Sequence, residues 1–300
     1  MDRFESMTVL LTAVEAGSLS AAGRRLGMPL ATVSRKVSEL ETHVKARLLS
    51  RSTRKLTLTD AGRDYAVACK RILEDVNEAE RAASGEYSAP RGELIVTAPI
   101  VFGRLHVLPV TTEFLAAYPE VSVRLVLGDR VVNLLEDQVD LAVRIGELPD
   151  SSLIATRVGT IRRVVCGSPT YFAAYGTPES PQALGAHKCV TFAALMSPDS
   201  WVFKVDGVDV SVPVHSRLIV TTAEAAIDAA ISGLGVTRVL SYQIDQPSRA
   251  GLLNVALRDF EPAPLPVSLV YAGHARLPLK LRAFLDFAAP RLRERVESAI

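Results

Sequence analysis

The sequence has few of the features that mark extracellular, membrane or metal-binding proteins. Its 300 residues include only 3 cysteines, which are far apart and form no CxxC pair. This argues against a disulfide framework or a zinc site and is typical of a reducing compartment. The first residues mix acidic and basic side chains and lack the apolar core of a signal peptide. No run of about eighteen uncharged apolar residues occurs, so we expect a cytoplasmic protein without a membrane span.

Catalytic motifs are also missing. The 5 histidines form no HExxH or other paired spacing, and there is no GxSxG. Ser168 lies in a GSPTY stretch that resembles a nucleophile motif, but its place before a proline in a strand-to-helix turn favours a helix N-cap. Cys166 and Cys189 fall in apolar predicted strands, which favours buried thiols over a redox switch. We therefore predict no enzyme, no metal site and no cofactor.

Basic charge is concentrated near the N-terminus, although the net charge is only +1. Residues 1–63 carry 11 Lys and Arg against 6 Asp and Glu, a balance of +5, whereas residues 64–300 carry 23 against 27, a balance of −4. Within 24–55 there are 9 bases and only two acids, Glu39 and Glu41. Such a distribution favours a phosphate-binding surface at one end of the chain, and a solvated basic face is the alternative.

The apolar spacing near the N-terminus predicts three helices, over 3–16, 19–26 and 30–45. Gly17 ends the first, and Ser18 can cap the second because its hydroxyl accepts from an unpaired backbone amide. Gly27 and Pro29 break the chain before the third helix. Two short helices joined by a tight glycine-containing turn are typical of a helix-turn-helix.

A wing and a long helix are predicted next. Residues 48–58 alternate apolar and polar side chains around a basic turn, as in a two-stranded wing. Thr59 can cap a long helix that begins at Asp60 and carries small and apolar residues along one face. We call this face the dimer seam; its residues are Ala61, Tyr65, Ala68, Ile72, Val76, Ala79 and Ala83. The seam predicts pairing with a second copy, and packing onto the chain's own globular domain is the alternative.

The sequence changes character after a hinge-like stretch, SGEYSAPRG at 84–92. Short apolar strands are predicted over 94–96, 121–127, 141–145, 163–166, 189–192, 201–205, 208–214, 218–220, 236–240 and 266–271. Helices are predicted over 103–117, 129–138, 169–175, 223–232 and 278–294. This alternation is typical of parallel sheets covered on both faces. Two such units in tandem predict a bilobed α/β domain with a binding cleft at the carboxyl ends of its strands.

These patterns predict three segments in the chain. A winged helix-turn-helix, all-α apart from its wing, takes 1–59, and a linker helix with the hinge takes 60–89. The bilobed domain takes 90–300. Its lobe I is assigned about 90–162 and 267–300, and its lobe II about 163–266, because the last strand and helix can return to the first unit.

A long N-terminal stretch, SLSAAGRRLGMPLATVSRKVSELETHVKARLLSRSTRKLTLTDAG, resembles the signature of the LysR-type transcriptional regulators. The matching positions are Ala21, Ala22, Leu26, Ser34, Leu40, Glu41, Leu48, Arg51, Leu58, Thr59 and Gly62. YPEVSVRL, VDLAVRIGELPDSSLIATRVG and SGLGVTRV are similar to that family's effector domain, so the resemblance covers nearly the whole chain. Leu49 replaces a usual Phe, and Leu30 replaces a commonly polar residue at the start of the recognition helix.

The resemblance implies a fold, a function and partners. The fold is a winged helix-turn-helix with a linker helix, followed by a periplasmic-binding-protein-like effector domain. The function is sequence-specific regulation of transcription under the control of a small-molecule inducer held between the lobes. The partners are a double-stranded DNA operator with an inverted repeat, RNA polymerase, and further copies of the chain in a homodimer or a dimer-of-dimers tetramer.

The third predicted helix and the wing carry the candidate DNA-binding residues, since recognition helices contact base edges with their early residues. Arg35 is the first candidate for a base contact because its guanidinium can pair bidentately with guanine, and Lys36 is a candidate for phosphate. The full set is Ser18, Pro29, Thr32, Ser34, Arg35, Lys36, Arg51, Thr53 and Arg54. A solvated surface position is the alternative for each, and for Arg51 a salt bridge within the domain.

The candidate effector-binding residues follow the predicted strands. The loop at 97–100 precedes a helix, so its backbone amides can bind an anionic group. Thr221 and Thr222 hold the equivalent place in lobe II, where helix capping is the alternative. Arg144 ends a strand and can meet a carboxylate or form an ordinary ion pair. The set is Thr97, Ala98, Pro99, Ile100, Asp129, Arg144, Phe192, Thr221 and Thr222.

Another class of function is compatible with the bilobed scaffold. A solute-binding protein or a small-molecule enzyme can be built on two α/β lobes with an accessory helical domain. The lack of a signal peptide argues against a transport receptor, and the long N-terminal match argues against both.

Overall fold

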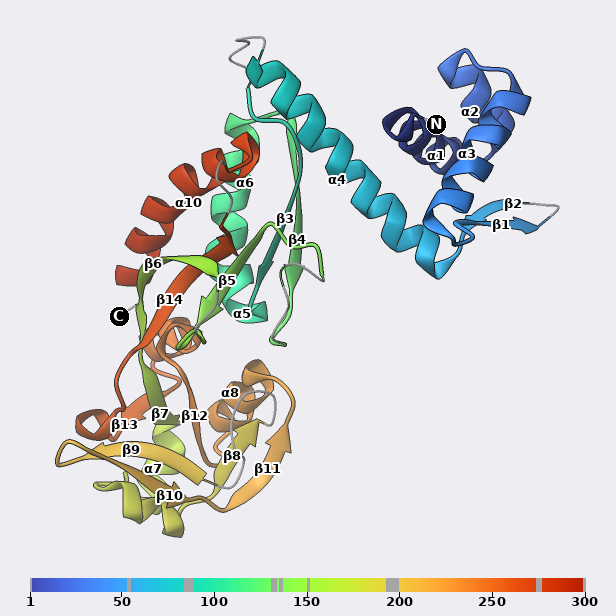
Figure 1. Cartoon of the computed structure of the whole chain (residues 1–300). Coiled ribbons are helices and arrows are strands. Elements are labelled where there is room, and N and C mark those ends of the chain that lie inside the picture. Colours follow the sequence, from blue (N-terminus) through green and yellow to red (C-terminus); the bar gives the residue numbers. More distant parts are fainter. Residues whose placement is uncertain are drawn as a thin grey trace. The chain divides into compact units, whose positions relative to one another are not determined.

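The structure is a computed structural model that describes residues 2–52, 55–83, 89–130, 134, 137–149, 152–192, 200–273 and 277–298. The chain forms two compact units, Met1–Ala89 and Pro90–Ile300 (Figure 1). The predicted wing tip, Thr53 and Arg54, and positions 84–88 of the predicted hinge lie outside the described residues.

The first unit begins with the three predicted helices, α1 (Arg3–Ala16), α2 (Leu19–Leu26) and α3 (Leu30–Val44). Gly17 ends α1 in the left-handed region at φ 70°, where glycine has no steric cost. The hydroxyl of Ser18 accepts from the Ala21 amide at 3.1 Å and so caps α2, as predicted. Their core consists of Val9, Leu10, Ala13, Ala22, Val33, Val37, Leu40, Leu48 and Leu49.

The predicted wing and long helix are also present. Strands β1 (Leu49–Ser52) and β2 (Lys55–Leu58) pair antiparallel, and α4 runs over Asp60–Ala83. The Thr59 hydroxyl accepts from the Gly62 amide at 2.9 Å and donates to the Arg47 carbonyl at 2.6 Å. A Cβ added to Gly62 would lie 1.9 Å from the Leu48 carbonyl oxygen. The start of α4 therefore crosses the start of the wing in direct backbone contact, which only glycine allows.

Glu41 ties the wing to α3. One oxygen of its carboxylate accepts from the amides of Leu48 and Leu49, at 2.8 and 3.0 Å. Because a charged acceptor strengthens these hydrogen bonds, the entry to β1 is fixed to the last turn of the recognition helix.

Lobe I of the second unit is a five-stranded mixed sheet in the order β4-β3-β5-β14-β6 (Figure 1). Its strands are β3 (Gly92–Ala98), β4 (Val121–Leu127), β5 (Leu141–Ile145), β6 (Leu153–Ile161) and β14 (Leu265–Ala272). Its helical segments are α5 (Ile100–Phe102), the π-helix η1 (Gly103–Val107), α6 (Leu108–Ala117) and α10 (Leu279–Glu297). Phe114 of α6 meets Phe284 of α10 edge-to-face, at 5.0 Å between ring centroids, within the core.

Lobe II is a second five-stranded mixed sheet, in the order β11-β8-β12-β7-β13. Its strands are β7 (Arg163–Gly167), β8 (Cys189–Phe192), β11 (Ser216–Val220), β12 (Val236–Leu240) and β13 (Asn254–Ala256). A hairpin of β9 (Ser200–Val205) and β10 (Val208–Pro213) contributes to one core, and α8 (Ala223–Ile231) to the other. The shorter helices are α7 (Pro169–Tyr175), η2 (Pro181–Ala186), η3 (Ser241–Gln243), α9 (Asp245–Arg249) and η4 (Arg258–Phe260).

The prediction of parallel sheets holds only in part, because both sheets are mixed. β3 runs parallel to β4 and β5, but β14 runs antiparallel to β5 and β6, and β12 antiparallel to β7. The chain passes from lobe I to lobe II after β6 and returns to lobe I in β14. Because β14 enters the lobe I sheet from lobe II, it runs antiparallel to both of its neighbours, β5 and β6. Strands β6 and β13 were not predicted, because their stabilising partners are distant in sequence. The predicted helix over 129–138 falls largely outside the described residues, and its described positions lie in bends and turns.

The segment Ile100–Ala117 is, among the described residues, the one helical run long and apolar enough to cross a membrane by length and composition. It contains Arg104 and His106, and it buries Phe102 and Phe114 in the core of lobe I. Its apolar character therefore serves packing inside the lobe.

Candidate functional site

The recognition helix α3 presents one apolar face to the core and one face to solvent. Val33, Val37 and Leu40 are buried, whereas Arg35 lies on the exposed side with its side chain 62% exposed. Its guanidinium donates to the Glu39 carboxylate at 2.7 Å, one helical turn later. Leu30 is 52% exposed, so an apolar side chain stands at the N-terminal end of this helix.

The structure places the other predicted DNA-binding residues unequally. Pro29 is exposed at the N-cap of α3, and Thr32 and Ser34 are half-buried. Lys36 is only 13% exposed, and its ammonium pairs with the Glu5 carboxylate of α1. This ion pair connects α1 to α3, so the Lys36 ammonium already has a carboxylate partner inside the unit. The wing residues Thr53 and Arg54 and the side chain of Arg51 lie outside what the structure describes.

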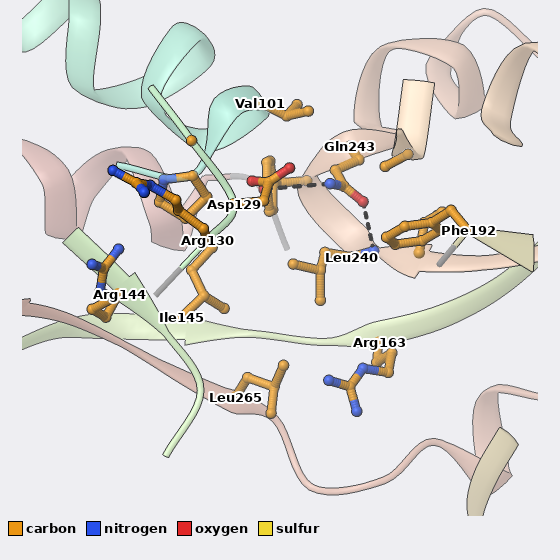
Figure 2. A pocket seen from close by; sticks show the side chains of 15 residues that line it. Val101, Asp129, Arg130, Arg144, Ile145, Arg163, Phe192, Leu240, Gln243 and Leu265 are labelled. Carbon is orange, nitrogen blue, oxygen red and sulfur yellow. Dashed lines mark hydrogen bonds between the residues drawn. The ribbon is translucent and has the colours of Figure 1, made fainter. Parts of the chain in front are cut away.

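A cavity of about 230 Å³ lies between the two lobes of the second unit (Figure 2). Lobe I contributes Pro99, Val101, Gly128, Asp129, Arg130, Arg144, Ile145 and Leu265. Lobe II contributes Arg163, Phe192, Ala223, Val239, Leu240, Tyr242 and Gln243. A concave, mostly apolar pocket with a few polar groups at a lobe junction is the usual form of a small-molecule site.

Four of the nine predicted effector-binding residues line this cavity: Pro99, Asp129, Arg144 and Phe192. The other five do not. Thr97 is buried in lobe I, where its hydroxyl donates to the Val126 carbonyl at 2.9 Å, and Ala98 is buried in the lobe I core. Thr221 and Thr222 are exposed, and the Thr222 hydroxyl caps α8 by accepting from the Ala225 amide at 3.3 Å, which is the capping alternative.

The predicted anion-binding loop is partly occupied by the protein itself. The Ile100 amide donates to the Asp129 carboxylate at 3.1 Å. Asp129 is the one acidic residue among the described residues that line the cavity, and three arginines line it as well: Arg130, Arg144 and Arg163. Burial lowers the pKa of Arg144 and of Arg163, because the charged form loses hydration.

Several lining residues were missed because two strands run antiparallel. In a purely parallel sheet only the carboxyl ends of strands meet the cleft. Here Arg163 opens β7 opposite Leu240 at the end of β12, and β14 starts next to the end of β5. First residues of antiparallel strands therefore share an edge with the last residues of their neighbours.

His106 is a buried histidine between the lobes. Its ring lies 4.7 Å from the Phe102 ring and 5.5 Å from the Tyr242 ring of lobe II, and neither ring nitrogen has a hydrogen-bond partner. Burial, with a smaller effect of Arg295, lowers its pKa to about 4, and Asp245 opposes this shift. The side chain also lines a second cavity of about 330 Å³, which is lined on its acidic side by Glu224, Asp228 and Asp245.

The low pKa of His106 predicts acid sensitivity. In the unfolded chain the His106 imidazole is protonated below its ordinary pKa of 6.5. In the folded chain it is protonated only below about pH 4. Stability is therefore lost as the pH falls through this window, by about 2 kcal/mol between pH 7 and pH 5. We expect His106→Phe to flatten the dependence of the urea midpoint on pH in this range. An unchanged slope in His106→Phe would contradict this explanation.

The cysteines of lobe II do not meet. Cys166 packs with α8 on one face of the sheet, and Cys189 packs with the hairpin core on the other. Burial raises the pKa of both thiols to about 12, which keeps them protonated and unreactive. The interpretation as ordinary buried thiols fits this arrangement better than a redox pair. Ser168 caps α7, accepting from the Tyr171 amide at 3.2 Å, as predicted.

Two family descriptions match this chain. "Bacterial regulatory helix-turn-helix protein, lysR family" matches residues 4–63, and "LysR substrate binding domain" matches residues 88–293. The chain belongs to the LysR family. A LysR-type regulator binds DNA through the first of these domains and an effector through the second, so this chain is a DNA-binding transcriptional regulator with an effector-binding domain.

Relatives of this LysR-type regulator match along nearly its full length. An HTH-type transcriptional regulator of Xanthomonas campestris is 36% identical over 95% of this chain and 84% of its own length. The transcriptional activator AaeR of Escherichia coli K12 is 31% identical over 95% of this chain and 93% of its own. The solved structure of CrgA from Neisseria meningitidis is 31% identical, covers 96% of this chain and 98% of its own, and superposes with a TM-score of 0.62.

Proposed function

We propose that this regulator acts in the cytoplasm as a homodimer or dimer-of-dimers tetramer on an inverted-repeat operator, where it contacts RNA polymerase. In this proposal it has no enzymatic activity and no cofactor, and a small-molecule inducer in the cavity between the lobes controls it. The names of the relatives, all transcriptional regulators, support this reading.

The exposed position of Arg35 on the recognition helix is the observation that supports the DNA-binding part of the proposal. Arg35 is exposed on the first half of α3, its fork is held in place by Glu39, and the neighbouring Lys36 is engaged with Glu5. Arginine in this position of a recognition helix can pair bidentately with a guanine edge in the major groove. We therefore assign base reading to Arg35 and no base contact to Lys36.

Replacing Arg35 with alanine tests the proposal. We expect Arg35→Ala to cost about 1–3 kcal/mol on DNA from upstream of its own gene and less on random DNA, so that specificity falls. Fluorescence anisotropy at fixed moderate salt measures both affinities, since phosphate contacts make affinity depend on salt.

Arg25→Ala is the matched control. Arg25 is 61% exposed and, like Arg35, pairs with one acid, Glu15. It lies on α2 rather than on the recognition helix, so its loss should not change the ratio of the two affinities. An equal loss on both DNAs in Arg35→Ala would reduce Arg35 to a phosphate contact, and no binding by the wild-type chain to any upstream DNA would contradict the proposed function.

A further inference from the structure

Two arginines lie on the same face of the lobe II sheet. In the antiparallel pair of β7 and β12, Arg238 lies opposite Val165 and Arg163 lies opposite Leu240. Residues that oppose each other across antiparallel strands point to the same side, so both arginines emerge on one face as diagonal neighbours. Burial and, to a smaller extent, the charge of Arg163 lower the pKa of Arg238.

Arg238 is held deep in the lobe. It is 5% exposed, donates to the Val202 carbonyl at 2.8 Å, and lies 5.5 Å from the Trp201 ring centroid and 5.8 Å from that of Phe203. Its Nε is buried without a hydrogen-bond partner. Burial, followed by the charge of Arg163, lowers its pKa to about 9, so it remains a cation at neutral pH.

Arg163 stands between Arg238 and the cavity. It lines the cavity between the lobes, and its Nε is also buried without a partner (Figure 2). Within the described part of the chain, neither Arg163 nor Arg238 forms an ion pair with a carboxylate, whereas the adjacent Arg162 pairs with Glu261 at 2.9 Å. Arg238 is buried and Arg163 is half-buried, and a cation that loses hydration without gaining a counter-ion is costly, so this pair of arginines favours an anion that enters the cavity.

The walls of the cavity add a second requirement. Val101, Ile145, Phe192 and Leu265 present apolar side chains around the charged groups (Figure 2). A ligand that pairs with the arginines and also packs against these apolar side chains has a negatively charged end and an apolar body. The planar guanidinium of Arg163 matches a carboxylate, with which it can form two parallel hydrogen bonds.

We propose that the inducer of this regulator is a small organic carboxylate with an apolar body, whose charge is met by Arg163 and, behind it, by Arg238. The proposal rests on the proposed function in one respect, that the cavity between the lobes is the inducer site. Arg163 is the contact residue, and Arg238 is a positioning residue that adds its charge from the core.

Matched pairs of small molecules test the charge requirement on the full-length protein. We would measure the thermal midpoint and the calorimetric affinity with phenylacetate against phenylacetamide, hexanoate against hexanamide, and sodium sulfate. At least one carboxylate should stabilise the protein while its amide and sulfate do not, because ligand binding to the native state adds stability by mass action. Amides that stabilise as well as carboxylates, a response to sulfate alone, or no response to any carboxylate would overturn the proposal.

Substitutions then locate the charge. Arg163→Met should reduce affinity for that carboxylate at least about tenfold, since a charge-assisted hydrogen bond is lost. It should also raise or maintain the melting temperature of the ligand-free protein, because a half-buried charge without a counter-ion is replaced by an apolar side chain. Arg238→Lys keeps the charge and should retain more affinity than Arg238→Met. Arg258→Met, at an exposed arginine of lobe II that lines neither cavity, is the control.

The outcomes separate the two proposals. If the wild-type protein binds its upstream DNA but Arg163→Met keeps full carboxylate affinity, the anion site is wrong and the regulator remains. If Arg163→Met lowers the ligand-free melting temperature by several degrees, Arg163 has a structural role and the proposal fails. If no upstream DNA is bound, the proposed function fails whatever the ligands do.

Discussion

Gly62→Ala is expected to unfold the DNA-binding unit while the second unit stays intact. The added methyl would lie 1.9 Å from the Leu48 carbonyl oxygen, an atom of the backbone that cannot rotate away. Either α4 or the start of the wing must shift, and Glu41 holds the start of the wing through two amides. We expect a loss of about 3 kcal/mol or more and loss of operator binding at 25 °C, measured by calorimetry and anisotropy.

Gly185→Ala is the matched control for this substitution. Gly185 has no atom within 4 Å of an added Cβ, and its φ is not in the left-handed region. The same change of residue should therefore shift stability by less than about 0.5 kcal/mol. If Gly62→Ala binds the operator with wild-type affinity, the backbone contact between α4 and the wing is not a requirement of the fold.

Ile72→Asp is expected to abolish the proposed dimer and with it high-affinity DNA binding. On α4, Ala66 and Cys69 are buried, and Tyr65 of the dimer seam packs partly on the core of its own unit. The alternative interpretation of the seam therefore holds for its first turns. Ile72, one of the later residues of the seam, is 39% exposed. An exposed apolar side chain at this position is expected if the seam packs against a second copy of the chain.

A buried aspartate in a helix pair has no partner for its charge, so the pair should dissociate. Loss of the second half-site contact should lower operator affinity at least about a hundredfold. Val67→Asp is the control: Val67 is 44% exposed but lies five residues away, about 140° around the helix. An unchanged mass of Ile72→Asp in light scattering would show that the copies meet elsewhere.

The helix-turn-helix could be predicted from the sequence because its signals are local. Gly17 and Ser18 mark the end of one helix and the start of the next within two residues, and their hydrogen bonds involve atoms three residues away. The pairing of Lys36 with Glu5 was missed, since nothing in the spacing of α3 indicates which face meets α1. The helix could therefore be placed from the sequence, but the partner of Lys36 could not, and its contact with DNA phosphate stays a prediction.

The effector cavity was predicted less completely because its geometry depends on distant pairings. Arg144 and Phe192 lie at the ends of predicted strands and Asp129 lies just after one, so the rule for parallel sheets found them. The same rule, applied to the end of β12, would also have indicated Tyr242 and Gln243. It could not indicate Arg163, because only the antiparallel pairing of β7 with β12 brings the first residue of a strand to the cleft.

The position of β14 has a consequence for synthesis on the ribosome. In lobe I this strand lies between β5 and β6 and pairs with both, yet it is the last strand of the sheet to be made. All five strands of lobe II are translated before it, so lobe II can close while lobe I still exposes the unpaired edges of β5 and β6. A nascent chain stalled before Leu265 would carry a folded lobe II attached to an incomplete lobe I sheet. The unpaired edges of β5 and β6 are the surface that we expect a chaperone to bind in this form.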